Sequence, residues 1–288
     1  MGAGSRDSAI YRWHLPLGAG GCETLCAPAY QAGVLAMHRT KDAALQLFVK
    51  RLVSRCNLTD AERGALLDLA GHCKQVAAHV DFVRLGEQVD HACLVVDGLV
   101  GRFGQTRDGI RQITCLYIPG DIADLASVVS PRSGWALGAL ADTTILQIPH
   151  ADMRGLAAKH PGVAEAFWRD CVADGSIFSE WVVNVGRRNA LSRLAHVFCE
   201  MAIRCEEAGH GDRTSFPLPI TQPDLGDATG LTGVHVNRTL RDLRTAGIVE
   251  LRAGVVTIHN WEKLVSVGDF NAAFMLLGGP ASRITEAA

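Results

Sequence analysis

Residues 220–249, ITQPDLGDATGLTGVHVNRTLRDLRTAGIV, predict two short helices that are joined by a tight turn. Thr221 is placed to cap the first helix, because a threonine oxygen accepts a hydrogen bond from an otherwise unpaired backbone N–H. Pro223 falls in the first helical turn, where its missing N–H costs nothing. Gly230 supplies the left-handed residue that the turn needs, and Thr232 caps the second helix. This arrangement is typical of a helix-turn-helix motif.

The second helix, predicted over residues 233–246, has an apolar side and a basic side. Residues near the N-terminus of such a helix reach base edges in the major groove of DNA. An ordinary amphipathic helix with a solvated basic face is the alternative, but the capped first helix and the glycine turn upstream favour DNA binding. The predicted DNA-facing residues are Thr221, Gln222, Val234, His235, Asn237, Arg238 and Arg241.

Three of these side chains have distinct predicted roles. Arg238 suits a bidentate contact with guanine, and Asn237 suits a bond to a base or to a phosphate. Arg241 lies one turn further along the helix, and we expect it to contact phosphate.

Two β-rich runs follow the second helix. Ile248–Leu251 and Val255–Ile258 are separated by Arg252-Ala253-Gly254, and the glycine provides the dihedral angles that a tight turn requires. The pattern predicts a β-hairpin wing, so the motif is expected to be a winged helix-turn-helix.

Length and composition set the remaining limits. The 288 residues leave room for two domains, and 48% hydrophobic with 20% charged residues is a globular composition. The net charge of −2 argues against a protein that coats nucleic acid non-specifically, although a local basic patch suffices for DNA binding. No run of eighteen apolar residues predicts a membrane span, and no continuous apolar core precedes Ala27-Pro28-Ala29 as in a signal peptide. We therefore expect a cytoplasmic protein that does not contact membranes.

The cysteines and histidines do not predict a metal site or an enzyme. Among nine cysteines, only Cys22 and Cys26 are closely spaced, and neither a repeated Cys-x2-Cys pair nor a histidine pair completes a zinc set. A cupin-type metalloenzyme is disfavoured because the β-rich region has no His-x-His. Nucleophile-elbow, phosphate-loop and HExxH motifs are also missing from the sequence.

The chain before the long helix divides into two segments by sequence pattern. Residues 1–42 show little periodicity and are predicted to be a poorly ordered extension, within which Met37 is an alternative start. Residues 43–160 are predicted to form a sensor domain, in which Thr59 and Glu62 make a capping box that begins a helix. Between residues 76 and 149, short β-rich runs alternate with glycines, which predicts an antiparallel β-roll.

Residues 161–188 predict one long helix. Its apolar positions recur in steps of three and four, with Asp174 as a polar interruption, which is typical of a coiled-coil seam. We expect this seam to hold a homodimer, because helix-turn-helix proteins read two half-sites about one DNA turn apart; packing on its own domain is the alternative. The predicted seam residues are Val163, Phe167, Cys171, Phe178, Trp181 and Val185. Residues 189–262 then form the DNA-binding domain and residues 263–288 a tail, in which Phe270–Leu277 is a candidate docking helix.

The order of a β-roll, a long helix and a winged helix-turn-helix, an α+β fold, resembles the cyclic-AMP receptor protein and fumarate–nitrate reductase regulator (CRP/FNR) family of bacterial transcription factors. The resemblance covers roughly residues 45–262 and rests in the C-terminal part on Ile220-Thr221, Asp224-Leu225-Gly226, Gly230-Leu231-Thr232, Val236-Asn237-Arg238 and Leu240. In the roll it rests on Gly86, Val96-Asp97-Gly98 and Pro119-Gly120-Asp121. The resemblance implies a homodimer that binds a palindromic operator, contacts RNA polymerase and is switched by a signal sensed in the roll.

The recognition helix departs from the family pattern at one position. Val234 stands where many members place a glutamate, four residues before Arg238. Because valine suits contact with a thymine methyl group, whereas glutamate accepts from cytosine, we expect an operator that differs at that base pair.

The sensor half departs further from the pattern of cyclic-nucleotide binders. The segment Asp121–Ala126 lacks the family's Gly-Glu pair, and the candidate effector-pocket pair Arg132-Ser133 is about one residue out of register. Cyclic AMP is therefore not the expected ligand. Three alternatives for the signal are left: a different small molecule, a thiol redox event, or no signal beyond the expression level. The alternative function is a sensing module that acts through protein contacts.

Metal cofactors known in the family also match this sequence poorly. Iron–sulfur members need four cysteines, whereas only Cys22 and Cys26 cluster here and Gln147 stands at the expected roll position, leaving Cys56 and Cys115 as possible substitutes. A haem needs an axial histidine, for which His79 and His91 are the candidates. We expect neither cofactor.

Overall fold

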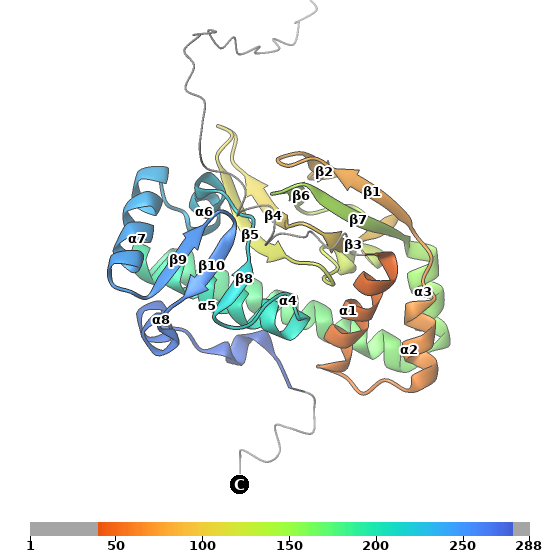
Figure 1. Ribbon diagram of the computed structural model, residues 1–288. Helices are drawn as coiled ribbons and strands as arrows, with labels where there is room; N and C mark the ends of the chain where they lie inside the picture. The colour runs from red at the N-terminus through yellow and green to blue at the C-terminus, as the bar shows by residue number, and fades with distance from the viewer. Residues whose placement is uncertain (1–39, 279–288) are drawn as a thin grey trace, which may run out of the picture. The chain divides into compact units, whose positions relative to one another are not determined.

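The computed structural model describes residues 40–278 (Figure 1). The chain divides into a unit of residues 1–37 and a unit of residues 38–288, and all described residues belong to the second unit. The predicted N-terminal extension, with Cys22 and Cys26, therefore lies almost wholly outside the described residues. None of the helices in the described part is long and apolar enough to cross a membrane.

Two helices precede the sheets. Helix α1 (Lys41–Val53) is capped by Thr40, and α2 (Asp60–Leu67) begins at the predicted capping box. There the Thr59 hydroxyl accepts from the Glu62 backbone N–H, while the Glu62 carboxylate accepts from the Thr59 N–H at 2.9 Å. This reciprocal pairing satisfies two otherwise unpaired donors, as its spacing predicts.

The roll consists of two antiparallel sheets, with strand orders β1-β7-β3 and β2-β6-β4-β5. Its strands are β1 (His72–Val76), β2 (Asp81–Val83), β3 (His91–Asp97), β4 (Val100–Gln105), β5 (Arg111–Tyr117), β6 (Ala136–Ala139) and β7 (Thr143–Pro149). The sequence did not predict β1 and β6. Four of the five residues of β1 are exposed, and β6 is the short run ALGA, so neither shows the alternation that identifies a strand.

Strand β3 is buried on both faces and thereby separates two hydrophobic clusters. Cys93 and Val95 belong to the cluster that fills the roll and continues into the C-terminal domain. The alternate residues Leu94 and Val96 belong to a second cluster with α1, α2 and the first turns of the long helix. Alternate side chains of a strand point to opposite faces, so one strand contributes to both cores.

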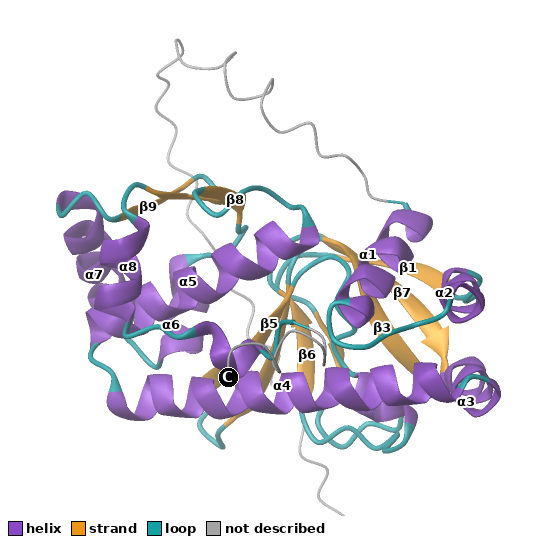
Figure 2. Cartoon of the chain, turned by 90° about the horizontal axis from the view of Figure 1, so that it is seen from below, coloured by secondary structure: helices purple, strands orange, loops and turns teal. Residues whose placement is uncertain are grey.

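Two helices connect the roll to the C-terminal domain. Helix α3 (His150–Lys159) leads into α4 (Pro161–Arg187), which is the long helix of Figure 2 that passes strands β5 and β6. A short helix η1 (Leu125–Val128) follows β5 and contacts both α3 and α4. Helix α4 begins at Pro161 because proline is favoured at the first helical position, where its missing N–H would have no partner within the helix.

The predicted dimer seam on α4 is wrong for at least three of its six residues. Val163 and Phe167 are buried in the second cluster, and Trp181 is buried in the roll cluster, where its indole N–H donates to Glu200 at 2.7 Å. The physical reason is that three- and four-residue steps identify an apolar side of a helix but not what covers it. Of the other three, Cys171 and Val185 are partly exposed and Phe178 is exposed.

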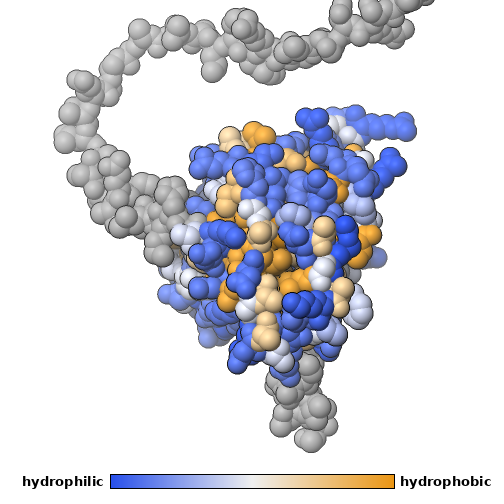
Figure 3. Space-filling model, turned by 90° about the vertical axis from the view of Figure 1, so that its right-hand side faces the viewer, coloured by the Kyte–Doolittle hydropathy of each residue, from blue (hydrophilic) through white to orange (hydrophobic). Residues whose placement is uncertain are grey.

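A different side of α4 presents apolar side chains to solvent. Trp168 is 70% exposed and Val172 is 62% exposed, and Val182 and Val183 are exposed further along the helix. On the face shown in Figure 3, hydrophilic residues surround an apolar patch near the centre.

The C-terminal domain is a helical unit with a three-stranded sheet of order β8-β10-β9. Its elements are α5 (Ala190–Ala208), β8 (Ser215–Pro217), α6 (Gln222–Thr229), α7 (Gly233–Thr245), β9 (Val249–Arg252), β10 (Val255–Ile258), α8 (Trp261–Gly268) and η2 (Ala272–Met275). The predicted hairpin is confirmed, with Ala253 and Gly254 both at positive φ in its turn. Strand β8 was not predicted.

Candidate nucleic-acid interface

The two helices of the motif are held by local chemistry. The Thr221 hydroxyl accepts from the Asp224 N–H at 3.3 Å, and the Asp224 carboxylate accepts from the Thr221 N–H at 3.0 Å. Gly230 ends α6 with φ at 64°, the left-handed region that glycine adopts without strain. A side chain at Gly226 would lie 2.7 Å from the Leu231 carbonyl oxygen, so only glycine allows the turn to fold back this closely.

Helix α7 has the predicted amphipathic form. Thr232 caps it by accepting from the His235 N–H at 3.4 Å, while Val236 and Leu243 are fully buried beneath it. It ends at Thr245 with Ala246 as its C-cap, one residue earlier than predicted. All the residues predicted to face DNA are exposed, namely Thr221, Gln222, Val234, His235, Asn237, Arg238 and Arg241.

Arg238 is available for contacts outside the chain. Its side chain is 72% exposed, and its one described ion pair is with Asp242 at the long distance of 3.9 Å. Val234 is 79% exposed at the start of the helix, so its side chain is accessible to a partner. Asn237 donates to the Gln222 side-chain oxygen at 3.3 Å, so the structure brings these two predicted residues together across α6 and α7.

The first helix of the motif also contacts the roll. Gln112 of β5 donates to the Ala228 carbonyl at 3.3 Å, and Arg193 of α5 donates to the Thr229 carbonyl at 2.9 Å. These bonds satisfy carbonyl groups at the C-terminal end of α6 that have no partner within the helix. The sequence did not reveal either residue, because partners 116 and 36 positions apart leave no local pattern.

The sensor half contains a cavity of about 420 Å³ between the roll and α4. Its walls come from β4 and β5, from the turn that ends in η1, from Gly134 and Trp135, and from α4 between Asp170 and Phe178. The predicted effector-pocket residues Arg132 and Ser133 are not among the lining residues. Arg132 is exposed, and the Ser133 hydroxyl donates to the Trp135 carbonyl at 2.7 Å, which turns it toward its own loop.

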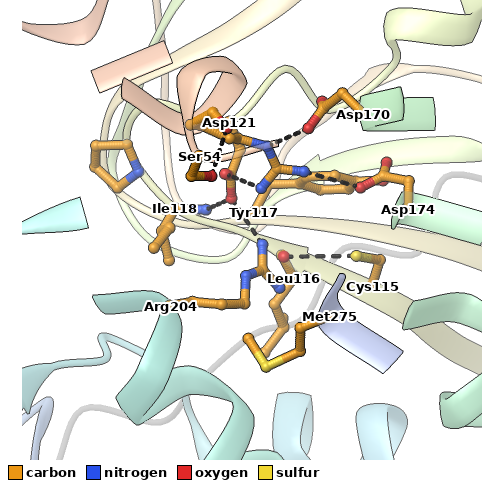
Figure 4. Close-up of polar contacts among 12 residues, drawn as sticks. Ser54, Cys115, Leu116, Tyr117, Ile118, Asp121, Asp170, Asp174, Arg204 and Met275 are labelled. Atoms are coloured by element: carbon orange, nitrogen blue, oxygen red, sulfur yellow. Dashed lines mark hydrogen bonds and ion pairs between the residues drawn. The ribbon is translucent and has the colours of Figure 1, made fainter. Parts of the chain in front are cut away.

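A buried ionic cluster lies beside this cavity (Figure 4). Three carboxylates converge on Arg51, at distances of 2.5 Å for Asp121, 2.7 Å for Asp170 and 3.2 Å for Asp174. Arg204 of α5 also pairs with Asp121, at 2.7 Å. The cluster therefore joins α1, the loop after β5, α4 and α5 by charge-assisted hydrogen bonds.

Burial and neighbouring charges set the acidity of this cluster. Burial acts to raise the pKa of Asp121, but Arg51 and Arg204 outweigh it and lower that pKa below its usual value. For Asp174, burial dominates and its pKa is raised. The one sequence signal for this cluster was Asp174 itself, as the polar interruption of an apolar helix. A buried pair that loses one partner leaves an uncompensated charge, so the cluster is sensitive to any single substitution.

The cysteines of the described residues do not fit an iron–sulfur cluster. Cys56 and Cys115 belong to different hydrophobic clusters, and burial raises the pKa of Cys115 to about 11, which disfavours the thiolate that a metal requires. Gln147 contacts the His91 ring at 2.5 Å. Within residues 40–278, no group of three or more His, Cys, Asp or Glu side chains is placed to hold a metal ion.

The haem candidates have other partners. His91 also contacts Asp90 through its other ring nitrogen at 2.8 Å, and His79 lies 3.8 Å from Asp224 of α6. Neither arrangement leaves a histidine pointing into the described cavity, whose lining contains neither residue.

Two family models match the chain. A cyclic nucleotide-binding domain matches residues 73–160, and a Crp-like helix-turn-helix domain matches residues 192–267. The chain is 22% identical over 245 residues to the fumarate and nitrate reduction regulatory protein of Vibrio cholerae, covering 85% of this chain and 96% of that protein. It is also 22% identical over 249 residues to the anaerobic regulatory protein of Aggregatibacter actinomycetemcomitans, covering 86% and 95% respectively.

A solved structure has the same architecture. FixK2 from Bradyrhizobium japonicum superposes with a TM-score of 0.64 at 25% identity, covering 71% of this chain and all of that one. The two matched models follow the order of domains found here, one over the roll and the other over α5 to α8. The chain belongs to the CRP/FNR family of DNA-binding transcription regulators.

Proposed function

We propose that this regulator binds a palindromic operator as a homodimer and reads each half-site through the first turns of α7. The observation that carries the proposal is the exposed, weakly paired guanidinium of Arg238 on a helix that Thr232 caps and Gly230 orients. A bidentate contact with a guanine would use this guanidinium, and Val234 would meet a thymine methyl group. Thr221, at the start of α6, would contact the phosphate backbone, and so would Arg241.

The dimer is held along the exposed side of α4 in this proposal. Trp168, Val172 and Val182 occupy positions of a seam whose steps alternate between four and three residues. The seam is completed by Gly175, Ser179 and Gly186, which are exposed and small enough for two helices to approach closely. Phe178 and Val183 flank it.

The remaining partners follow from the regulatory role. A transcription regulator of this kind works on chromosomal DNA in the cytoplasm and contacts RNA polymerase, and the cavity between the roll and α4 receives its signal. The chain's relatives are regulators, so we assign no catalytic residue. A module that senses a ligand and acts only through protein contacts is the competing function; the exposure of the whole predicted DNA-facing set favours DNA.

Operator selection followed by a salt series tests the proposal. Selection from random duplexes should return an inverted repeat, and the logarithm of the affinity should fall with the logarithm of salt by about 0.9 per neutralised phosphate. Arg238→Ala should lose about 1–3 kcal/mol on the selected site and relax the preference at one base pair. Lys263→Ala, an exposed cation on α8, is the matched control and should bind normally. Unchanged discrimination between operator and random DNA in Arg238→Ala would contradict base recognition by this residue.

A further inference from the structure

Arg102 of β4 is a buried cation without a close carboxylate partner. Its side chain is 11% exposed, and its one ion-pair contact within residues 40–278 is with Asp174 at 3.9 Å, beyond hydrogen-bond distance. No hydrogen bond from this guanidinium to another described residue is present. Asp174 is itself engaged by Arg51 at 3.2 Å and by the Tyr117 hydroxyl at 3.0 Å.

The other buried arginines of the same region are paired differently. Arg51, Arg55 and Arg204 each donate to a carboxylate at 3.2 Å or less. A guanidinium offers five donors, and leaving them unpaired in a buried place is costly. Arg102 is therefore the one member of this group that donates to no carboxylate of the described residues.

Three aromatic rings surround the Arg102 guanidinium. Its central carbon lies 5.1 Å from the ring centroid of Trp135 and 5.8 Å from those of Tyr117 and Phe178. Arg102, Trp135 and Phe178 all line the cavity of about 420 Å³, which is large enough for a small organic molecule. Aromatic rings around a planar guanidinium favour a ligand that has a planar apolar body and a planar acidic group.

We propose that this cavity binds a small organic carboxylate with a planar, aromatic-type body, and that Arg102 anchors its carboxylate group. The proposal rests on the proposed function, in which the cavity receives the signal. A carboxylate has the two oxygens that a guanidinium binds in parallel. Asp124 lines the cavity at the position that precedes η1, and its carboxylate, which accepts from the Cys93 N–H, disfavours a phosphate group there and with it a cyclic nucleotide.

The position of the anchor links the ligand to the rest of the regulator. Arg102 belongs to the roll, whereas Asp174, Gly175 and Phe178 of the cavity wall belong to α4. Gly175 is also a position of the exposed seam that we assign to the dimer. A carboxylate bound to Arg102 would accept hydrogen bonds from the N–H groups that now face Asp174. It would thereby alter the contact between the roll and α4.

Three probes of nearly identical shape test the class of ligand on the full-length protein. Benzoate, benzamide and benzamidine differ chiefly in charge, and their binding is followed by ligand-observed NMR titration, with cyclic AMP as a fourth probe. We expect benzoate to bind about tenfold or more tightly than the neutral and cationic probes, since hydrogen bonds between two charged groups are stronger than those to a neutral group. Cyclic AMP should not compete with benzoate.

Variants assign the binding to the anchor. Arg102→Gln should weaken benzoate binding about tenfold or more and abolish the preference for the anion. Arg111→Gln is the matched control, because Arg111 also lies in the roll over an aromatic ring and pairs with Asp81, yet does not line the cavity. If Arg102→Gln does not fold, Arg102→Lys keeps the charge and should show a smaller loss, and the probe series on the natural protein still applies.

Several results would overturn the proposal. They are equal or tighter binding of benzamide or benzamidine, benzoate binding that survives Arg102→Gln, and competition by cyclic AMP. Operator binding is measured with and without benzoate, for the natural protein and for Arg238→Ala. A normal anion site with no operator binding would contradict the proposed function alone, whereas normal operator recognition without anion binding would contradict this inference alone.

Discussion

The side chains of Asn237 and Gln222 meet across the helix-turn-helix, with the Asn237 amide nitrogen 3.3 Å from the Gln222 carbonyl oxygen. One residue lies in α7 and the other begins α6, so the two amides form a single polar unit at the exposed front of both helices. The pairing leaves the Asn237 oxygen and the Gln222 nitrogen as an acceptor and a donor for DNA. Paired donors and acceptors of this kind are suited to the major-groove edge of adenine.

Asn237→Ala should therefore lower affinity for the selected operator by about 1–3 kcal/mol and relax the preference at one base pair. Gln222→Ala should show a similar but smaller relaxation at the same base pair, because it removes the partner that orients Asn237. A double-mutant cycle measured by operator titration checks this coupling. Strictly additive losses, or relaxation at two unrelated base pairs, would show that the two amides act independently.

Val234→Glu should change the operator rather than abolish binding. The side chain is 79% exposed on the first turn of α7, so a glutamate fits there without repacking. A carboxylate accepts from the amino group of cytosine, whereas valine contacts the thymine methyl group. Selection experiments on both proteins should return half-sites that differ at one base pair. Identical selected sites would mean that residue 234 does not touch a base.

The features predicted best from the sequence are those with short-range causes. Thr221, Gly230 and Thr232 were placed correctly because caps and left-handed turns act within four residues of the chain. The capping box of Thr59 and the hairpin turn at Gly254 belong to the same class. The residues exposed on α7 were predicted from the 3.6-residue period of an α-helix alone.

Features with long-range causes were missed. Arg51 and Asp170 are 119 residues apart, and nothing in the neighbourhood of either predicts their pairing. Arg102 gave no signal in the sequence, because its surroundings come from β5, from the segment before β6 and from α4. The wrong seam residues on α4 have a related cause. This helix has apolar side chains on two sides, and only the tertiary structure shows that Trp181 faces the roll core while Val172 faces solvent.

Val172→Glu should convert the dimer into a monomer. An ionised carboxylate at this position would have to be buried in an apolar helix–helix contact, which is strongly unfavourable. The natural protein should sediment as a dimer and the variant as a monomer with an unchanged far-ultraviolet spectrum. Leu85→Glu is the matched control, since Leu85 is 68% exposed but lies in the loop between β2 and β3, outside α4. A Val172→Glu protein that stays dimeric at micromolar concentration would exclude this side of α4 as the interface.

His196 should make the stability of the protein depend on pH. The ring is fully buried between Phe270 and Phe274, and burial, assisted by the Arg188 charge, lowers its pKa to about 4. Since the unfolded ring has a pKa of about 6.5, the folded protein excludes the proton. The stabilisation is complete above pH 6.5 and is lost as the pH falls toward 4, by on the order of 3 kcal/mol.

Chemical denaturation at pH 7.5 and at pH 4.5 measures this loss. His196→Phe keeps an aromatic ring between the two phenylalanines but cannot take up a proton, so its unfolding free energy should fall less over the same interval. His235→Phe is the control, because His235 is exposed on α7 and its variant should keep the pH dependence of the natural protein. The assignment fails if His196→Phe loses as much stability on acidification as the natural protein does, since carboxylates elsewhere would then account for the whole effect.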